Sequence, residues 1–246
     1  MAGFNVCRQT VRYLGPRGTT KLILGRLLSF NKVFILQKSL SAIAAPNPHR
    51  MQLSIAPVDE RDWEAIFRQA HCLDVESRRE ILARANFFRN DLKNCFAVRN
   101  QSGLIAHIQW IVFPEENEVM SGRYRHFFNP LGDHEIMIEN AFTFPRFRGL
   151  GLLTHASRHL LNLAGRRGYR KAVTYVRSEK FASLNELIRL GFCITKVVPE
   201  YKVLGFTRRA LERGRPGRRK DAGAPAGSSC PGAAAEGKGD RQHELR

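Results

Sequence analysis

Hydrophobic and polar positions follow regular periods mainly in the middle of the chain. Residues 51–57 alternate between apolar and polar side chains, as expected for a half-buried strand. The next segment, 59–71, opens with an aspartate that can cap a helix and repeats its large apolar side chains at helical spacing. A second helical period occupies 76–93. This part of the chain therefore predicts one strand followed by two helices.

Strands and helices alternate further along the chain. Two apolar runs, 95–99 and 104–113, flank the turn-forming residues NQSG and predict a β-hairpin. After the loop 115–134, the predicted elements are a strand over 135–144, a helix over 152–164, a strand over 171–176, a helix over 178–190 and a strand pair over 192–203. Hairpins followed by helical crossovers indicate an α/β domain with a mixed sheet.

The loop 115–134 is polar and aromatic, without a period, and could cover a substrate. Its aromatic group is Tyr124, His126, Phe127 and Phe128. Such loops carry binding residues in many proteins, but their aromatic side chains more often cap a core. We therefore expect core packing here rather than ligand contact.

The two ends differ from the middle in composition. Residues 208–246 are rich in Arg, Gly, Ala, Pro and Ser, so we expect them to be disordered and dispensable for stability. Residues 1–50 combine a broken helical pattern with a short apolar strand at 33–36 and a Pro-containing linker. The expected division is an N-terminal extension over 1–50, a folded domain over 51–207 and a disordered basic tail over 208–246.

The leading segment allows two interpretations. A basic, acid-free, amphipathic stretch could be an interfacial membrane helix or a transit-like peptide. It could instead fold against the domain, and we favour this because an apolar strand seldom belongs to a cleaved signal. Charged residues interrupt every apolar run well before the roughly 20 residues that span a bilayer.

The net charge of +18 resides mostly in the ends. Residues 1–50 carry eight Lys or Arg and no acid, and residues 208–246 carry ten against five acids, which leaves +5 for 51–207. A mildly basic middle suits an anionic cofactor, and no known nucleic-acid-reading motif is present. We therefore expect no specific nucleic-acid partner, and at most peripheral contact of the basic ends with anionic surfaces.

The five cysteines and eight histidines show no metal-ligand spacing. The cysteines are odd in number and far apart, without a CxxC pair. The closest histidines, His155 and His159, lack the glutamate of an HExxH motif. We therefore expect no bound metal and a reducing, cytoplasmic environment.

A glycine-rich turn joins the strand over 135–144 to the following helix. It reads PRFRGLGLL from Pro145, with glycines at 149 and 151. Glycines allow a tight turn that exposes backbone N–H groups, and the helix adds its positive N-terminal end. Arg146 and Arg148 add charge suited to a diphosphate. The turn is a candidate anion site, although many strand-to-helix turns use glycine only for tight packing.

This turn and the later segment KFASLNELIRLGF resemble the two acetyl-CoA signatures of the GNAT (N-acetyltransferase) superfamily. The element order over 51–207 also resembles that superfamily. The resemblance implies a mostly antiparallel sheet flanked by helices. It further implies an enzyme that moves an acetyl group from acetyl-CoA, its co-substrate, to an amine of a small metabolite, amino sugar or protein. The alternative is a non-catalytic acyl-CoA-binding regulatory module.

The resemblance also implies the coenzyme contacts. The backbone of Phe142, Thr143 and Phe144 would line the pantetheine arm. The pyrophosphate would be held by Arg148, Gly149, Leu150, Gly151, Leu152 and Leu153. The motif Arg-x-x-Gly-x-Gly/Ala fits either from Arg148 to Leu153 or from Arg146 to Gly151. We favour the first register, which keeps the usual distance from Pro145 but puts Leu153 at a Gly/Ala position, where it could crowd the phosphates.

The second signature departs from the family pattern. Ser183 matches and is assigned to the coenzyme site, but Lys180 replaces the usual Asn. Leu187 replaces the Tyr that many relatives use as the general acid toward the departing thiolate. Tyr201, Tyr175 or solvent would then have to supply that proton.

Glu139 is the candidate general base. It lies two residues before Ala141, where the strand is expected to cross the acetyl group, and a glutamate in so apolar a run needs a reason. The alternative is that Glu139 faces solvent or pairs with a core arginine. His134, at the strand entrance, is the reserve base.

Overall fold

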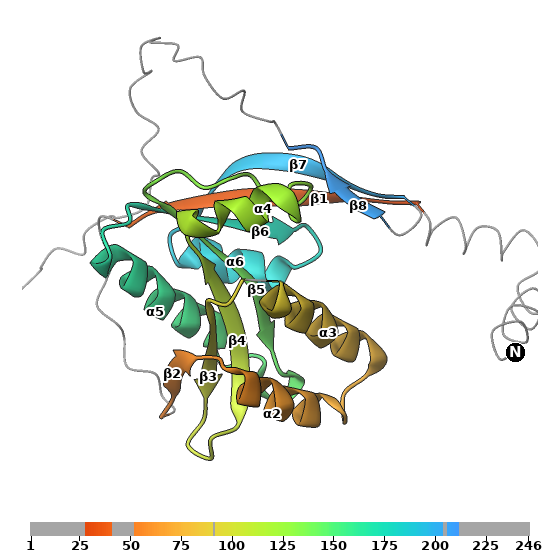
Figure 1. Ribbon diagram of the computed structural model, residues 1–246, viewed down its shortest axis with the longest axis vertical. Coiled ribbons are helices and arrows are strands. Elements are labelled where there is room, and N and C mark those ends of the chain that lie inside the picture. Colours follow the sequence, from red (N-terminus) through yellow and green to blue (C-terminus); the bar gives the residue numbers. More distant parts are fainter. Residues whose placement is uncertain (1–27, 41–51, 91, 204–205, 212–246) are drawn as a thin grey trace, which may run out of the picture. The chain divides into compact units, whose positions relative to one another are not determined.

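The computed structural model describes residues 28–40, 52–90, 92–203 and 206–211, all within the compact unit Met1–Arg213. The strands are β1 (Leu28–Ser39), β2 (Ser54–Pro57), β3 (Cys95–Arg99), β4 (Ile105–Val112), β5 (Glu135–Thr143), β6 (Lys171–Arg177), β7 (Cys193–Val203) and β8 (Phe206–Arg209). The helices are α2 (Glu60–Ala70), α3 (Val75–Arg89), α4 (Asn117–Gly122), α5 (Leu152–Arg166) and α6 (Phe181–Arg189), with short 3-10 turns η1 (Pro114–Glu116) and η2 (Pro145–Phe147) (Figure 1).

The strands form one eight-stranded sheet in the order β2-β3-β4-β5-β6-β1-β7-β8. Only β5 and β6 run parallel, and every other neighbouring pair is antiparallel. This confirms the predicted mixed, mostly antiparallel sheet flanked by helices. The strand pair predicted over 192–203 is instead one long strand, β7, which pairs with β1 on one side and β8 on the other.

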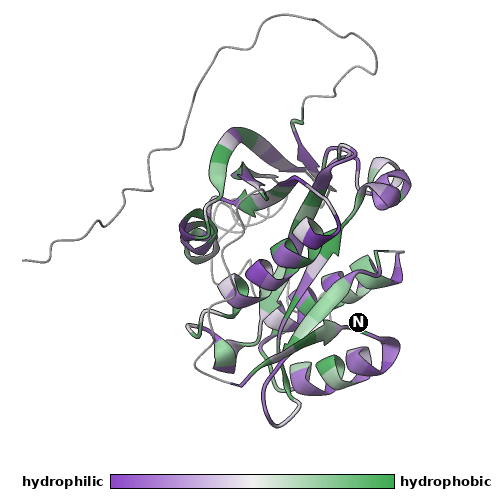
Figure 2. Cartoon of the chain, turned by 90° about the vertical axis from the view of Figure 1, so that its left-hand side faces the viewer, coloured by the Kyte–Doolittle hydropathy of each residue, from purple (hydrophilic) through white to green (hydrophobic). Residues whose placement is uncertain are grey.

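Apolar clusters cover both faces of the sheet. Side chains alternate between faces, so Trp110 of β4 joins the cluster built with α2 and α3, while its neighbour Ile111 joins the one built with α5 and α6. Figure 2 shows apolar stretches along the strands and helices of mixed polarity. Burial on both faces explains why β4 reads as an almost continuous hydrophobic run rather than an alternating one.

β1 lies inside the sheet, although the sequence assigned residues 1–50 to an extension. It pairs with β6 from Val33 to Ser39 and with β7 from Leu28 to Gln37. Twelve residues are extended, against the four predicted. A domain boundary at residue 50 would therefore cut off a strand bonded on both sides. The predicted leading helix and linker lie outside the described residues.

The predicted start of the tail at residue 208 is wrong, because β8 runs to Arg209. The guanidinium of Arg209 bonds the carboxylate of Glu200 at 2.8 Å and donates to the Phe127 carbonyl oxygen at 2.8 Å. It also lies over the rings of Phe128 and Tyr175. An arginine in a basic stretch looks solvated in the sequence, but here a buried acid neutralises it. Residues 212–246 lie outside the described part of the chain.

Candidate functional site

The parallel strands β5 and β6 separate partway along their length. Their register covers only Glu135–Met137 against Lys171–Val173. Beyond that point the side chain of Glu139 bridges the two strands, because its Oε1 accepts the backbone N–H of Tyr175 at 2.7 Å. The second half of β5 therefore pairs with β4 on one side and diverges from β6 on the other.

A β-bulge lies where the strands diverge. Ile108 pairs with Phe142 and Trp110 with Glu139, so Asn140 and Ala141 together face one residue of β4. Asn140 has a φ of 59°, in the left-handed region. Bulges bend a strand and often occur beside active sites. The bulge falls where the resemblance places the acetyl group.

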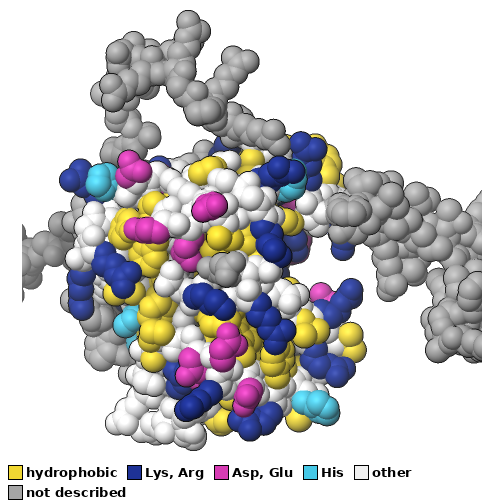
Figure 3. Space-filling view, viewed as in Figure 1, with side chains coloured by type: hydrophobic (Ala, Val, Ile, Leu, Met, Phe, Trp, Pro, Cys, Tyr) yellow, Lys and Arg dark blue, Asp and Glu magenta, His cyan; other side chains and the backbone are white. Residues whose placement is uncertain are grey.

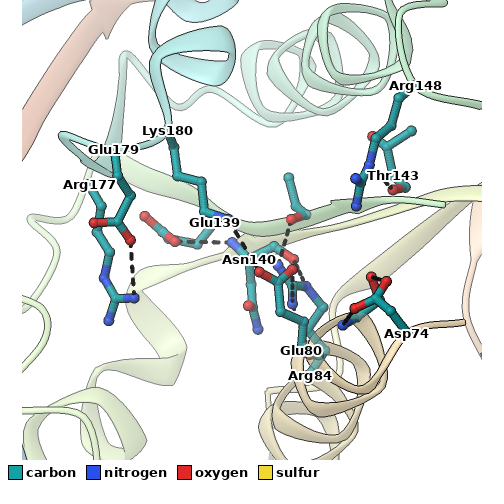
Figure 4. A network of polar contacts seen from close by, with 12 residues as sticks. Asp74, Glu80, Arg84, Glu139, Asn140, Thr143, Arg148, Arg177, Glu179 and Lys180 are labelled. Atoms are coloured by element: carbon teal, nitrogen blue, oxygen red, sulfur yellow. Dashed lines mark hydrogen bonds and ion pairs between the residues drawn. The ribbon is translucent and has the colours of Figure 1, made fainter. Parts of the chain in front are cut away.

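Arg84 of α3 binds this bulge. Its Nε donates to the carbonyl oxygen of Asn140 at 3.0 Å and its Nη2 to that of Ala141 at 2.8 Å. Glu80, one turn earlier, pairs with Arg84 and also with Lys180 at the start of α6, whose Nζ lies 3.2 Å from Glu80 Oε1. Figure 4 shows these side chains converging from α3 and α6. The sequence analysis missed Arg84 and Glu80, because each looks like an ordinary polar residue of a helix.

The surroundings of Glu139 shift the pKa of its carboxyl group in opposite directions. Burial raises the pKa of its carboxyl group, while the charges of Arg209 and Arg84 and the N–H groups of Asn140 and Tyr175 oppose that rise. Both carboxylate oxygens accept backbone N–H bonds, the second from Asn140 at 3.0 Å. A carboxylate with a raised pKa can accept a proton, so Glu139 stays a candidate base. Its hydrogen bonds, among the described residues, are with the backbone N–H groups of Asn140 and Tyr175.

The glycine turn has the geometry of an anion site. Gly149 and Gly151 have φ values of 78° and 69°, and Gly151 caps α5 without a side-chain hydrogen bond. The first N–H groups of α5 have no acceptor within the helix, and its dipole favours negative charge there. A Cβ atom at either glycine would meet no atom within 4 Å, so backbone conformation, not crowding, selects glycine.

The two arginines of the turn lie differently. Arg148 is exposed and its Nε donates to the Thr143 carbonyl oxygen at 3.3 Å, at the end of β5. Arg146 donates to Gln69 at 3.1 Å and lies over the ring of Phe147. Both registers of the Arg-x-x-Gly motif remain open. Leu152 is buried, Leu153 half-buried and Leu150 exposed.

The end of β5 presents backbone rather than side chains. Phe142 and Phe144 are buried in edge-to-face contact at 5.2 Å, so their rings belong to the core. The Thr143 hydroxyl bonds Nδ1 of His107 at 2.8 Å. Burial lowers the pKa of His107 to about 4, and among the described residues its Nε2 finds no hydrogen-bond partner. His107 is a third residue that the sequence analysis missed, although a histidine inside the apolar run IAHIQW was a visible signal.

The structure separates His134 from this site. It is exposed, directly before Glu135, and its carbonyl oxygen accepts the N–H groups of Arg170 and Lys171. Seven strand residues at about 3.3 Å each place it roughly 23 Å along the chain from Ala141. Its position argues against a role as reserve base.

The residue at the family's acid position and the two tyrosines considered as alternative proton donors lie in different surroundings. Leu187 is buried in the core, where an apolar side chain cannot donate a proton. Tyr201 is half-exposed, and its ring contacts that of Phe30. It lies on β7, which β1 separates from β6 in the sheet. Tyr175 adjoins Glu139, but its hydroxyl accepts the N–H of Asn129 at 3.2 Å and burial raises its pKa. Ser183 is partly buried in the first turn of α6.

The aromatic loop packs as expected. Tyr124 contacts Phe87 with ring centroids 4.8 Å apart, and Phe128 contacts Tyr175 at 5.1 Å. Phe127 packs against the same core cluster. The predicted core packing of these three aromatic side chains is confirmed, whereas the prediction of a loop over 115–134 is wrong in part, because the segment contains the helix α4.

The surface carries two further features. Basic and acidic side chains are interspersed on the face that carries α2 and α3 (Figure 3). A groove of about 330 Å³ contains none of the predicted site residues; it is lined by Leu53, Ile55, His155, Arg158, His159, Asn162, Leu163 and Arg166.

Within the described residues, no cluster of three His, Cys, Asp or Glu could hold a metal ion. No helix there has the length and apolar character needed to cross a membrane.

Neither a family model nor a curated protein sequence matches the chain. Among solved structures, it is similar to the GCN5-related glucosamine N-acetyltransferase region of a fungal multi-domain GH3 β-N-acetylglucosaminidase, with 13% identity over 74% of this chain and a TM-score of 0.53. It is also similar to a GNAT-family acetyltransferase from Colwellia psychrerythraea, with 12% identity, 72% and 57% of the two chains covered and a TM-score of 0.48. The first likeness shows that this chain has the GNAT fold; the match spans 22% of the fungal chain.

Proposed function

We propose that this protein is an N-acetyltransferase that moves an acetyl group from acetyl-CoA to an amine. The observation that carries the proposal is that one strand, β5, diverges from β6 at a bulge and ends in a two-glycine turn at the start of α5. Acetyl-CoA combines an extended amide-containing arm with a diphosphate. The edge of β5 that no longer pairs with β6 suits the arm, and the turn's N–H groups suit the diphosphate.

The coenzyme contacts follow from this arrangement. The backbone at 142–144 would meet the pantetheine arm, since the phenylalanine rings there are buried. The turn from Arg148 to Leu153 would hold the pyrophosphate, with Arg148 adding an exposed positive charge. Ser183, in the first turn of α6, would contact the coenzyme from the opposite side of the diverging strands.

In the proposed reaction the amine nitrogen attacks the thioester carbonyl carbon. A C–N bond forms, the C–S bond breaks, the amine loses a proton and the departing thiolate gains one. Glu139 is the proposed base, because it adjoins the bulge and burial raises the pKa of its carboxyl group. The thiolate takes its proton from Tyr175 or from solvent, since Leu187 has none to give.

A non-catalytic acyl-CoA-binding module is the competing proposal. Two observations favour it, namely the buried Leu187 at the family's acid position and Leu153 at a Gly/Ala position. Both functions require coenzyme binding, and only the enzyme requires turnover.

Two measurements separate these functions. The first is acetyl-CoA binding by calorimetry, and the second is release of the CoA thiol in the presence of an acceptor. The acceptor panel should contain amino sugars, polyamines, amino acids and peptide N-termini. Amino sugars belong in it because the similar fungal region is a glucosamine N-acetyltransferase. Acceptor-dependent thiol release supports the enzyme, binding without release supports the regulatory module, and absence of binding overturns both.

A further inference from the structure

Arg84 is a largely buried arginine whose contacts converge on the backbone of β5. Only 13% of its side chain is exposed. It bonds the carbonyl oxygens of two successive residues, Asn140 and Ala141, at 3.0 and 2.8 Å. Its guanidinium carbon also lies 5.0 Å from the ring centre of Phe142. Three consecutive residues of β5 therefore contact one side chain.

Holding two successive carbonyl groups has a conformational consequence. In a regular strand, successive carbonyl groups point to opposite sides, so a single guanidinium cannot bond both. The left-handed Asn140 turns the chain so that both oxygens face α3. A non-glycine residue keeps such a conformation only where its surroundings enforce it. The planar fork of an arginine supplies that enforcement, and a lysine ammonium lacks the same fixed geometry.

Burying an arginine is costly, and α3 could have packed here with an apolar side chain. Glu80 compensates the charge, at 3.5 Å from Arg84 Nη1. Glu80 also forms an ion pair with Lys180, at the start of α6, with 3.2 Å between Glu80 Oε1 and Lys180 Nζ. Arg84 is therefore linked to α6 through Glu80. Arg84 is thus buried beside the Asn140–Ala141 bulge, which directly follows Glu139 in β5.

We propose that Arg84 is a positioning residue for acetyl transfer, which fixes the Asn140–Ala141 bulge and thereby the place of the acetyl group relative to Glu139. The inference rests on the proposed function. Arg84 acts through the backbone and is not itself a catalytic residue. Without it, the bulge relaxes toward a regular strand and the reacting groups lose their alignment, while the glycine turn and its coenzyme contacts stay in place.

The test compares Arg84→Lys and Arg84→Gln with Arg78→Lys and Arg78→Gln, matched controls at an exposed position of α3. For both Arg84 variants we expect kcat to fall about 10-fold to 100-fold, since small misplacements of reacting groups cost this much. We expect a smaller change in the Kd for CoA, of about twofold to fivefold, because the contacts of Arg84 reach Phe142, beside the proposed pantetheine site, but not the turn that would hold the pyrophosphate. The controls should match the parent in both quantities. Glu80→Gln, which leaves both carbonyl contacts possible, should lower kcat less than either Arg84 variant.

Several results would overturn the inference. Full activity in Arg84→Lys would show that only the charge matters, and unchanged kcat in both variants would remove any positioning role. Equal losses of kcat, CoA affinity and melting temperature would assign Arg84 to stability alone. A parent that neither binds nor turns over acetyl-CoA would overturn the proposed function and this inference with it, whereas an active parent with unaffected variants overturns the inference alone.

Discussion

Glu139 and Tyr175 are joined across two diverging strands by a side chain instead of a ladder hydrogen bond. Oε1 of Glu139 accepts the Tyr175 N–H at 2.7 Å, two residues beyond Met137, the last residue of β5 that pairs with β6. The carboxylate therefore spans the point where β5 and β6 separate. A group in that position can hold the opening in shape and also exchange a proton with a ligand bound there.

Glu139→Gln tests the second role. The substitution keeps the shape of the side chain, removes its proton-accepting charge and replaces one of the two oxygens that accept backbone N–H bonds by an NH₂ group. We expect the rate of transfer to fall roughly 100-fold or more, with coenzyme affinity close to that of the parent. Because burial raises the pKa of Glu139, the parent's rate should rise with pH above the ordinary range for a glutamate. A variant whose pH profile keeps its full shape would assign that ionisation to the acceptor amine, and an unchanged rate would leave proton removal to water.

Gly151→Val tests the anion site. A β-branched residue is strained at a φ of 69° and would carry its side chain toward the approaching pyrophosphate. Calorimetry should show strongly weakened acetyl-CoA binding in a protein that remains folded. Gly103→Val is the matched control, because Gly103 has a φ of 75° and open space around it but lies in the β3–β4 hairpin. Equal coenzyme affinity in the two variants would remove the main support for the site.

His107 should make the fold sensitive to acid. Its pKa is lowered to about 4 in the folded protein. Between pH 6.5 and 4 the imidazole is therefore mostly protonated in the unfolded chain and mostly neutral in the folded protein. Stability should therefore fall as the pH drops through this window. Relative to the non-titrating variant His107→Asn, the parent should lose roughly 2 to 3 kcal/mol between pH 7 and 4.5 in urea unfolding. Parallel stability curves for the two proteins would contradict this.

Truncation tests the placement of β8. A chain that ends after Leu211 keeps Arg209 and should melt close to the full-length protein. A chain that ends after Thr207 loses Arg209 and leaves Glu200, 2% exposed, with Arg177 as its ion-pair partner among the described residues. Loss of one of the two cations beside a buried carboxylate is destabilising, so the melting temperature should fall by several degrees. Identical melting temperatures would show that β8 contributes little.

Local patterns determined much of this protein. The period of apolar residues predicted the helices α2, α3, α5 and α6, because a side chain's repeat reports the face that it buries. The glycines at 149 and 151 identified the turn, because a left-handed backbone restricts the residue type wherever it occurs. The resemblance to the GNAT superfamily predicted the fold that the sheet order confirms.

Tertiary structure decided what depends on distant partners. Val33 pairs with Arg177, so the place of β1 in the sheet rests on contacts across more than a hundred residues, which no local period records. Arg209 and Arg84 look like solvated side chains in the sequence, and only the fold brings the Phe127 carbonyl oxygen to one and the Asn140–Ala141 bulge to the other. The reason is that burial of a charge is set by its compensating partners, and those partners are chosen by the three-dimensional path of the chain.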